Sequence, residues 1–267
     1  MSNYSGPKAL TEYILYQSRH KANKTFPILL VQGILAGVYI SIGAIGYLKL
    51  VAGIAVPGLG SFLGAAVFPV GIIAVLFMQA ELFTSDTMVM VAVYSGHTKL
   101  HKIFRILFLI LVANLIGAVF VAILSKYAGL FDDKAVAMIM EKAVHKVHMP
   151  VGKLLASSIL CNIIVCTGVC LAYSCKEEIS KIVLVWLTIT VFVLSQTEHV
   201  VANMYYLFIA YFSGTGIKLT EILYNLSVAA IGNFIGGGIL VSGANYLLAF
   251  RDIEKKNTPE RNREEIQ

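Results

Sequence analysis

One long apolar stretch, residues 182–212, carries a carboxylate and an imidazole side by side, Glu198 and His199. Tyrosines aside, the stretch holds no other ionisable side chain. About 20 apolar residues suffice to cross a bilayer, so this stretch is too long for one plain membrane-spanning helix. Ionisable groups at such depth are costly and usually face a cavity or a pathway rather than lipid. We therefore expect a membrane protein with a polar site near the middle of the bilayer.

Runs that are free or nearly free of charge divide the chain into six apolar segments. They cover residues 25–48, 51–80, 106–125, 154–175, 182–212 and 222–250. Only 13% of the residues are charged, which is about half of what a soluble domain carries. We predict an all-α membrane protein of six transmembrane spans, with a channel domain over residues 25–250. Residues 1–24 would form a cytoplasmic segment with an amphipathic helix over 7–20, and residues 251–267 a cytoplasmic tail.

The lysines and arginines predict how the chain is oriented in the membrane. If the N-terminus is cytoplasmic, fourteen of the 21 Lys and Arg residues lie on inside segments and seven lie outside. This excess favours both termini in the cytoplasm of a cell that carries the protein in its inner or plasma membrane. The net charge of +6 then reflects membrane orientation, and it does not indicate a nucleic-acid partner.

Two short motifs recur in the second half of the chain. Residues 79–81, Gln-Ala-Glu, return as Gln-Thr-Glu at 196–198, and Asn-Leu-Ile-Gly at 114–117 returns as Asn-Phe-Ile-Gly at 233–236. Each half then contains three spans, and an odd number of spans turns the second copy upside down relative to the first. The sequence therefore predicts two inverted three-span repeats.

The second and fifth spans are expected to break at equivalent places, residues 81–86 and 198–203. Helix N-termini at such breaks direct free N–H groups toward the break, and this arrangement suits an anion. A carboxylate on an anion pathway would repel the substrate. We therefore expect Glu81 and Glu198 to face away and to accept hydrogen bonds from these N–H groups; the alternative is a buried carboxyl group neutralised by protonation.

Four segments together resemble the formate/nitrite transporter family, which includes hydrosulfide channels. They are Ala-Glu-Leu-Phe-Thr-Ser at 80–85, Cys-Asn-Ile-Ile-Val-Cys at 161–166, Glu198-His199 followed by Ala-Asn-Met at 202–204, and the run 231–238. The resemblance implies an aquaporin-like fold with broken second and fifth spans, a homopentamer, and one pore in each subunit. The chain departs from the family pattern at Gln79, where many members have glycine, and at Ser158, where glycine or alanine is usual.

The resemblance also implies roles for individual residues. His199 matches the central pore histidine, Thr84 and Asn162 match its polar neighbours, and Lys146 matches a lysine that draws anions toward the pore. Two apolar constrictions would flank this centre, formed by Phe68 and Phe192 on the outside and by Ile72 and Phe83 on the inside. From spacing alone, these four residues would be core or lipid-facing, and Lys146 would be one lysine of a solvated loop.

We hypothesise that Thr84, Asn162 and His199 donate hydrogen bonds to a small monovalent anion and that His199 passes it a proton. Formate, nitrite and hydrosulfide all fit such a site, and the hydrosulfide branch stays open, as does a proton-coupled anion symporter. A neutral-solute facilitator of the water and glycerol type would share the plan, but the chain lacks paired Asn-Pro-Ala motifs. No enzyme, cofactor or metal motif is apparent, and the four cysteines, all in the fourth span, predict helix packing.

Overall fold

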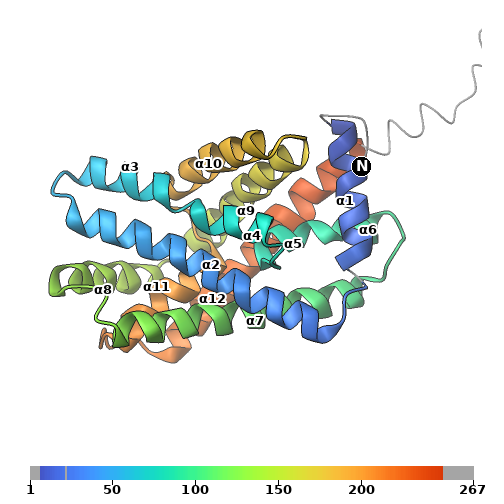
Figure 1. Ribbon diagram of the computed structural model, residues 1–267. Coiled ribbons are helices and arrows are strands. Elements are labelled where there is room, and N and C mark those ends of the chain that lie inside the picture. The colour runs from blue at the N-terminus through green and yellow to red at the C-terminus, as the bar shows by residue number, and fades with distance from the viewer. Residues whose placement is uncertain (1–6, 22, 249–267) are drawn as a thin grey trace, which may run out of the picture.

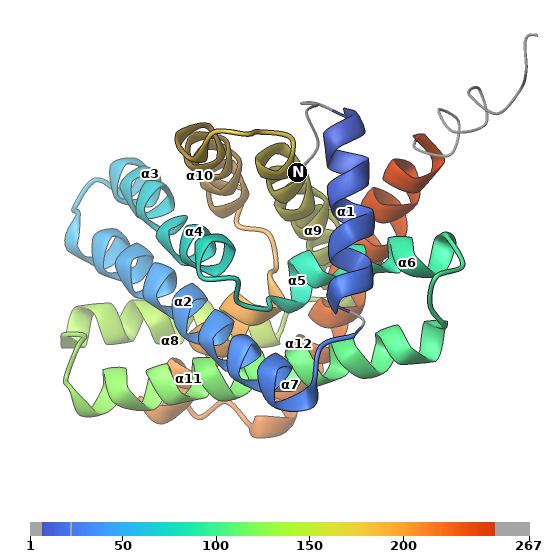
Figure 2. The ribbon, with the colours of Figure 1, turned by 45° about the vertical axis from the view of Figure 1, so that its right-hand side comes forward.

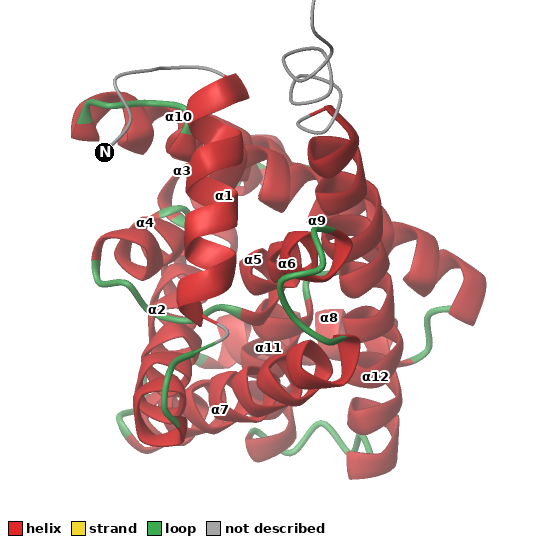
Figure 3. Cartoon of the chain, turned by 90° about the vertical axis from the view of Figure 1, so that its right-hand side faces the viewer, coloured by secondary structure: helices red, strands yellow, loops and turns green. Residues whose placement is uncertain are grey.

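The computed structural model describes residues 7–21 and 23–248, and in this part of the chain all regular structure is helical (Figures 1 and 3). The whole of the predicted 251–267 tail and the first six residues lie outside the described residues. The helices in chain order are α1 (Pro7–Lys21), α2 (Phe26–Gly53), α3 (Pro57–Val67), α4 (Val70–Phe77), α5 (Phe83–Asp86), a 3-10 turn (Thr87–Met90), α6 (Val91–Tyr94), α7 (Leu100–Tyr127), α8 (Asp133–Val147), α9 (Val151–Tyr173), α10 (Glu178–Leu194), α11 (Val200–Phe212), α12 (Leu219–Phe234) and a π-helical segment (Ile235–Val241).

Five helices of the described chain are long and apolar enough to cross a membrane. They span Phe26–Gly53, Pro57–Phe77, Leu100–Tyr127, Val151–Tyr173 and Leu219–Leu248. The fifth apolar run of the sequence, residues 182–212, lies instead on two shorter helices, α10 and α11. Helices suit these apolar segments because a helix satisfies its backbone hydrogen bonds internally, and lipid offers no partners for backbone N–H and C=O groups.

Two non-helical connections lie near the centre of the helical assembly (Figure 2). One joins α4, which ends at Phe77, to α5, and the other joins α10, which ends at Leu194, to α11. Each turns at a glutamine with left-handed backbone: φ is 53° at Gln79 and 50° at Gln196. A left-handed conformation costs a non-glycine residue about 1–2 kcal/mol. The surrounding packing must therefore impose both turns.

Glycines bring two pairs of long helices into backbone contact. A Cβ on Gly117 of α7 would lie 2.1 Å from the carbonyl oxygen of Ile34 in α2, and a Cβ on Gly236 would lie 2.3 Å from that of Ile159 in α9. No larger residue fits at either place. The glycine-rich run 232–238 therefore forms a close helix contact with α9. Its π-helical winding was not predicted from the sequence.

Two amphipathic helices of 15 residues each, α1 and α8, cover the assembly beside the long helices. The predicted helix over 7–20 is confirmed as α1, which packs on the 3-10 turn, α6 and α9. Helix α8, in the connection between α7 and α9, packs on α11, α2 and α12. Asp132 caps α8 by accepting a hydrogen bond from the N–H of Ala135 at 2.8 Å.

Candidate functional site

A hydrogen bond between Thr84 and His199 joins the two interruptions, by which we mean the non-helical connections before α5 and before α11. The hydroxyl oxygen of Thr84, in α5, lies 2.9 Å from Nε2 of His199, which directly precedes α11. Thr84 is fully buried and His199 is 3% exposed. Two residues that are 115 positions apart in the sequence thus meet in the interior, at the place where sequence analysis located the polar centre.

The second ring nitrogen of His199 defines which tautomer the neutral ring adopts. Nδ1 accepts the backbone N–H of Ala202 at 3.1 Å and so caps the start of α11. A nitrogen that accepts a hydrogen bond carries no proton, so the neutral ring has its proton on Nε2 and donates it to the Thr84 oxygen. The hydroxyl hydrogen of Thr84 then meets no acceptor among the described residues.

Asn114 and Asn233, rather than the glutamates, satisfy the first N–H group after each interruption. Asn114 Oδ1 accepts the N–H of Phe83 at 2.9 Å, and Asn233 Oδ1 accepts that of Val200 at 2.9 Å. The expectation that Glu81 and Glu198 would bind these groups is therefore corrected. The recurring Asn-x-Ile-Gly motif contained both asparagines, and it was the available signal for this role.

Both glutamate side chains instead bind lysines. Lys146 donates to Glu198 Oε1 at 2.7 Å, and Glu198 Oε2 accepts from Asn203 at 2.7 Å. In the first half, Lys24 donates to Glu81 Oε1 at 2.6 Å. Lys146 is thus paired with a buried carboxylate, and it is not one lysine of a solvated loop.

Asn162 has partners that differ from the expected ones. Its amide nitrogen donates to the carbonyl oxygens of Asn233, at 2.6 Å, and Thr84, at 3.1 Å, and to the Thr87 hydroxyl at 3.2 Å. Its buried carbonyl oxygen Oδ1 has no hydrogen-bond partner. Since all of its donors face protein acceptors, Asn162 fixes the backbone at Thr84 rather than offering an N–H to a ligand.

The four residues assigned to apolar constrictions are all buried, each at most 5% exposed. The rings of Phe68 and Phe192 lie 6.0 Å apart edge to face, and the Phe192 ring lies 5.6 Å from the His199 ring. Phe68, Phe192 and His199 therefore form a continuous contact on one side of the centre. Phe83 follows the first interruption directly, next to Thr84, while Ile72 lies in α4, one element earlier.

These features define a helical membrane protein in which two interrupted apolar segments meet at a buried threonine–histidine pair. A model of the formate/nitrite transporter family matches residues 8–247. The chain belongs to this family, so the resemblance drawn from four motifs is confirmed. Members of the family are channels and transporters rather than enzymes.

Individual relatives agree with this assignment. The chain is 30% identical over 244 residues to the formate channel BtFdhC of Bacillus thuringiensis, covering 90% of this chain and 94% of that protein. A solved ion channel of the same family superposes with a TM-score of 0.82 at 25% identity, over 90% of this chain and 98% of the other. A pentameric formate channel with formate bound has the same fold, with a TM-score of 0.75 at 24% identity over 84% of this chain and 98% of that one.

Proposed function

We propose that the protein is a membrane channel for small monovalent anions, with formate, nitrite and hydrosulfide as its substrate class. The observation that carries this proposal is the Thr84–His199 hydrogen bond between the two interruptions. The anion would accept the hydroxyl hydrogen of Thr84, and His199 Nε2–H would strengthen that donor through the Thr84 oxygen. A similar family member, the formate channel of Bacillus thuringiensis, supports formate as the first candidate.

The N-terminus of α11 favours an anion at the same place. The dipole of this 13-residue helix presents its positive end at His199. The N–H groups of Val200 and Ala202 are already bound by Asn233 and by His199 itself. The helix therefore contributes its field, while the hydrogen-bond donor comes from a side chain. Asn162 acts as a positioning residue that fixes the Thr84 backbone.

The apolar residues on either side would select against hydrated ions. Phe68 and Phe192, and Ile72 and Phe83, would form the two constrictions, where an anion must leave its hydration shell. An anion that takes up a proton from water near His199 would meet a lower barrier, because the neutral acid crosses an apolar gate at less cost. Lys146, paired with Glu198, would contribute to an entrance that attracts anions.

The proposed architecture has six spans in two inverted repeats, over residues 25–250. The second span would comprise α3 to α6 and the fifth α10 and α11, with the cytoplasmic segment 1–24 and the cytoplasmic tail 251–267 at either end. Matching contacts of Asn114 and Asn233 support the repeat. The shared fold with a pentameric formate channel supports a homopentamer in the cell membrane.

A flux assay in proteoliposomes tests this function. Purified protein should conduct formate, nitrite and hydrosulfide faster than protein-free liposomes, and a Thr84→Val variant should reduce all three fluxes. Thr84→Ser, which keeps the hydroxyl, is the matched control and should retain transport. Glycerol flux without any anion flux would overturn the proposal in favour of a neutral-solute facilitator.

A further inference from the structure

The first interruption carries one carboxylate more than the second. Asp86 precedes Asn203 by 117 residues, the same shift that relates Glu81 to Glu198. In the second half, Glu198 has one lysine and the neutral Asn203 as its partners. In the first half, an aspartate takes the place of that asparagine. Two acidic side chains, each 1% exposed, therefore lie where the other half buries one.

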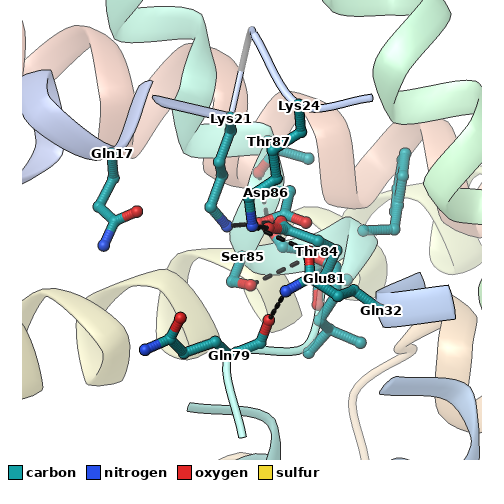
Figure 4. Close-up of polar contacts among 12 residues, drawn as sticks. Gln17, Lys21, Lys24, Gln32, Gln79, Glu81, Thr84, Ser85, Asp86 and Thr87 are labelled. Atoms are coloured by element: carbon teal, nitrogen blue, oxygen red, sulfur yellow. Dashed lines mark hydrogen bonds and ion pairs between the residues drawn. The ribbon is translucent and has the colours of Figure 1, made fainter. Parts of the chain in front are cut away.

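Two lysines from the region around the end of α1 approach these carboxylates (Figure 4). Lys21 contacts Asp86 Oδ1 directly, and its Nζ lies 2.8 Å from Glu81 Oε2. Lys24 donates to Glu81 Oε1 at 2.6 Å and to Gln32 at 2.9 Å. With all four groups charged, the cluster of Lys21, Lys24, Glu81 and Asp86 is neutral.

One oxygen of this cluster lacks a hydrogen bond. Asp86 Oδ2 is fully buried and has no partner among the described residues, whereas Glu81 Oε2 has Lys21 Nζ at 2.8 Å. Because Lys21 Nζ contacts both carboxyl groups, the two groups lie close together. Two ionised carboxylates this close repel each other, and a buried acceptor without a donor is costly. One proton between the two groups would remove both penalties.

We propose that Glu81 and Asp86 form a proton-binding site that shares one proton and thereby sets the charge of this end of the anion pathway. The proton comes from water on the side of α1 and returns to it, and no other bond changes. With the proton bound, the cluster has a net charge of +1 and attracts an anion; without it, the cluster is neutral. This inference rests on the proposed function and adds to it a residue, Asp86, that makes anion entry depend on pH.

Other ionisable side chains lie around the pair: Tyr13 of α1, Tyr173 and Cys166 of α9, His20, which precedes Lys21, and His199, which bonds Thr84. The rings of Tyr13 and Tyr173 are tilted to each other, with their centroids 4.2 Å apart. The Asp86→Asn variant leaves all of these groups in place, so it isolates the contribution of the carboxyl pair to the pH dependence.

Transport by an Asp86→Asn variant tests the functional half of the proposal. In wild-type vesicles, formate entry from the side of α1 should rise about tenfold as the pH on that side falls from about 8 to about 5.5. Asp86→Asn leaves a fixed charge of +1, so entry should be fast at both pH values. Asp133→Asn, which removes an exposed carboxylate from α8, should keep the wild-type profile. A wild-type pH profile in Asp86→Asn would overturn the proposal.

Infrared spectroscopy of the solubilised full-length protein tests the proton itself, without transport. At neutral pH the wild type should show a protonated carboxyl band that shifts on ¹³C-labelling of aspartate or of glutamate and disappears in Asp86→Asn. A spectrum without such a band in the wild type would also overturn the proposal, even if the variant failed to fold. If no anion crosses the membrane with any variant while the band is present, the transport function fails and the proton site stands.

Discussion

Asn114 and Asn233 make the same three hydrogen bonds in the two halves of the chain. Each accepts the first backbone N–H after an interruption, at 2.9 Å. Each also donates to the backbone carbonyl of the glutamate in its own interruption, Glu81 at 2.9 Å or Glu198 at 3.0 Å. Each donates as well to a backbone carbonyl of a neighbouring long helix, Gly33 at 2.8 Å or Ser158 at 2.7 Å. One side chain thus replaces the helical hydrogen bonds that each interruption removes.

Replacing either asparagine by leucine should destabilise the protein by about 3–5 kcal/mol, because three buried backbone groups lose their partners at once. Thermal unfolding in detergent measures the effect. Asn245→Leu is the matched control, since within the described part of the chain Asn245 bonds its own helix and a cysteine thiol, and it should cost much less. Equal losses in Asn233→Leu and Asn245→Leu would contradict this role.

Gln79→Gly should raise the free energy of unfolding by about 0.5–1 kcal/mol, and the unfolding temperature should rise modestly with it. Glycine adopts left-handed backbone without the steric cost, although it loses more entropy on folding. Gln79→Ala retains the cost and should bring no gain. The same pair of variants at Gln196 should behave alike, because its φ differs by only a few degrees. Stabilisation by alanine as large as that by glycine would rule out backbone strain.

Lys146→Met should destabilise the protein by about 2–4 kcal/mol, since it leaves Glu198 charged and buried. The double variant Lys146→Met with Glu198→Gln should recover most of this loss, because no unpaired charge remains. Anion flux tests the attraction separately: the Lys146→Met variant leaves a net charge of −1 and should transport more slowly than the wild type, most clearly at low ionic strength, whereas the neutral double variant should not. Unchanged flux at low salt would limit Lys146 to a structural role.

Nitrogen NMR of His199 should report a neutral ring protonated at Nε2 at neutral pH, because Nδ1 accepts the Ala202 N–H. Thr84→Val removes the acceptor of the Nε2 proton and should shift that resonance while the Nδ1 signal stays nearly constant. His199→Gln should alter anion selectivity or the pH dependence of transport. A proton found on Nδ1 would contradict the assigned tautomer.

The long apolar helices and the region of the polar centre followed directly from the sequence, because lipid permits only a few backbone arrangements. The recurring Gln-x-Glu motif contains both turns, but the breaks were predicted a few residues too late, at 81–86 and 198–203, where α5 and the start of α11 are helical. Charge alone could not predict partners: Lys146 is near several other lysines in sequence, and only the fold brings it to Glu198. For the same reason the donors of Asn162 were misassigned, since the backbone carbonyls that occupy them come from residues more than seventy positions away.

The two amphipathic helices α1 and α8 each carry, at or near their C-terminal end, a lysine that pairs with a buried glutamate, Lys21 with Glu81 and Lys146 with Glu198. Each half of the chain therefore supplies the same five supporting features. They are an amphipathic helix (α1 or α8), a lysine (Lys21 or Lys146), a glutamate (Glu81 or Glu198), a left-handed turn (Gln79 or Gln196) and a hydrogen-bonding asparagine (Asn114 or Asn233). The reactive ring occurs once, because the position 117 residues before His199 is the fully buried Leu82. In the proposed channel, a solute would pass two similar sets of supporting residues but a single imidazole, so substitutions at His199 should change selectivity without disturbing the supports of the first half.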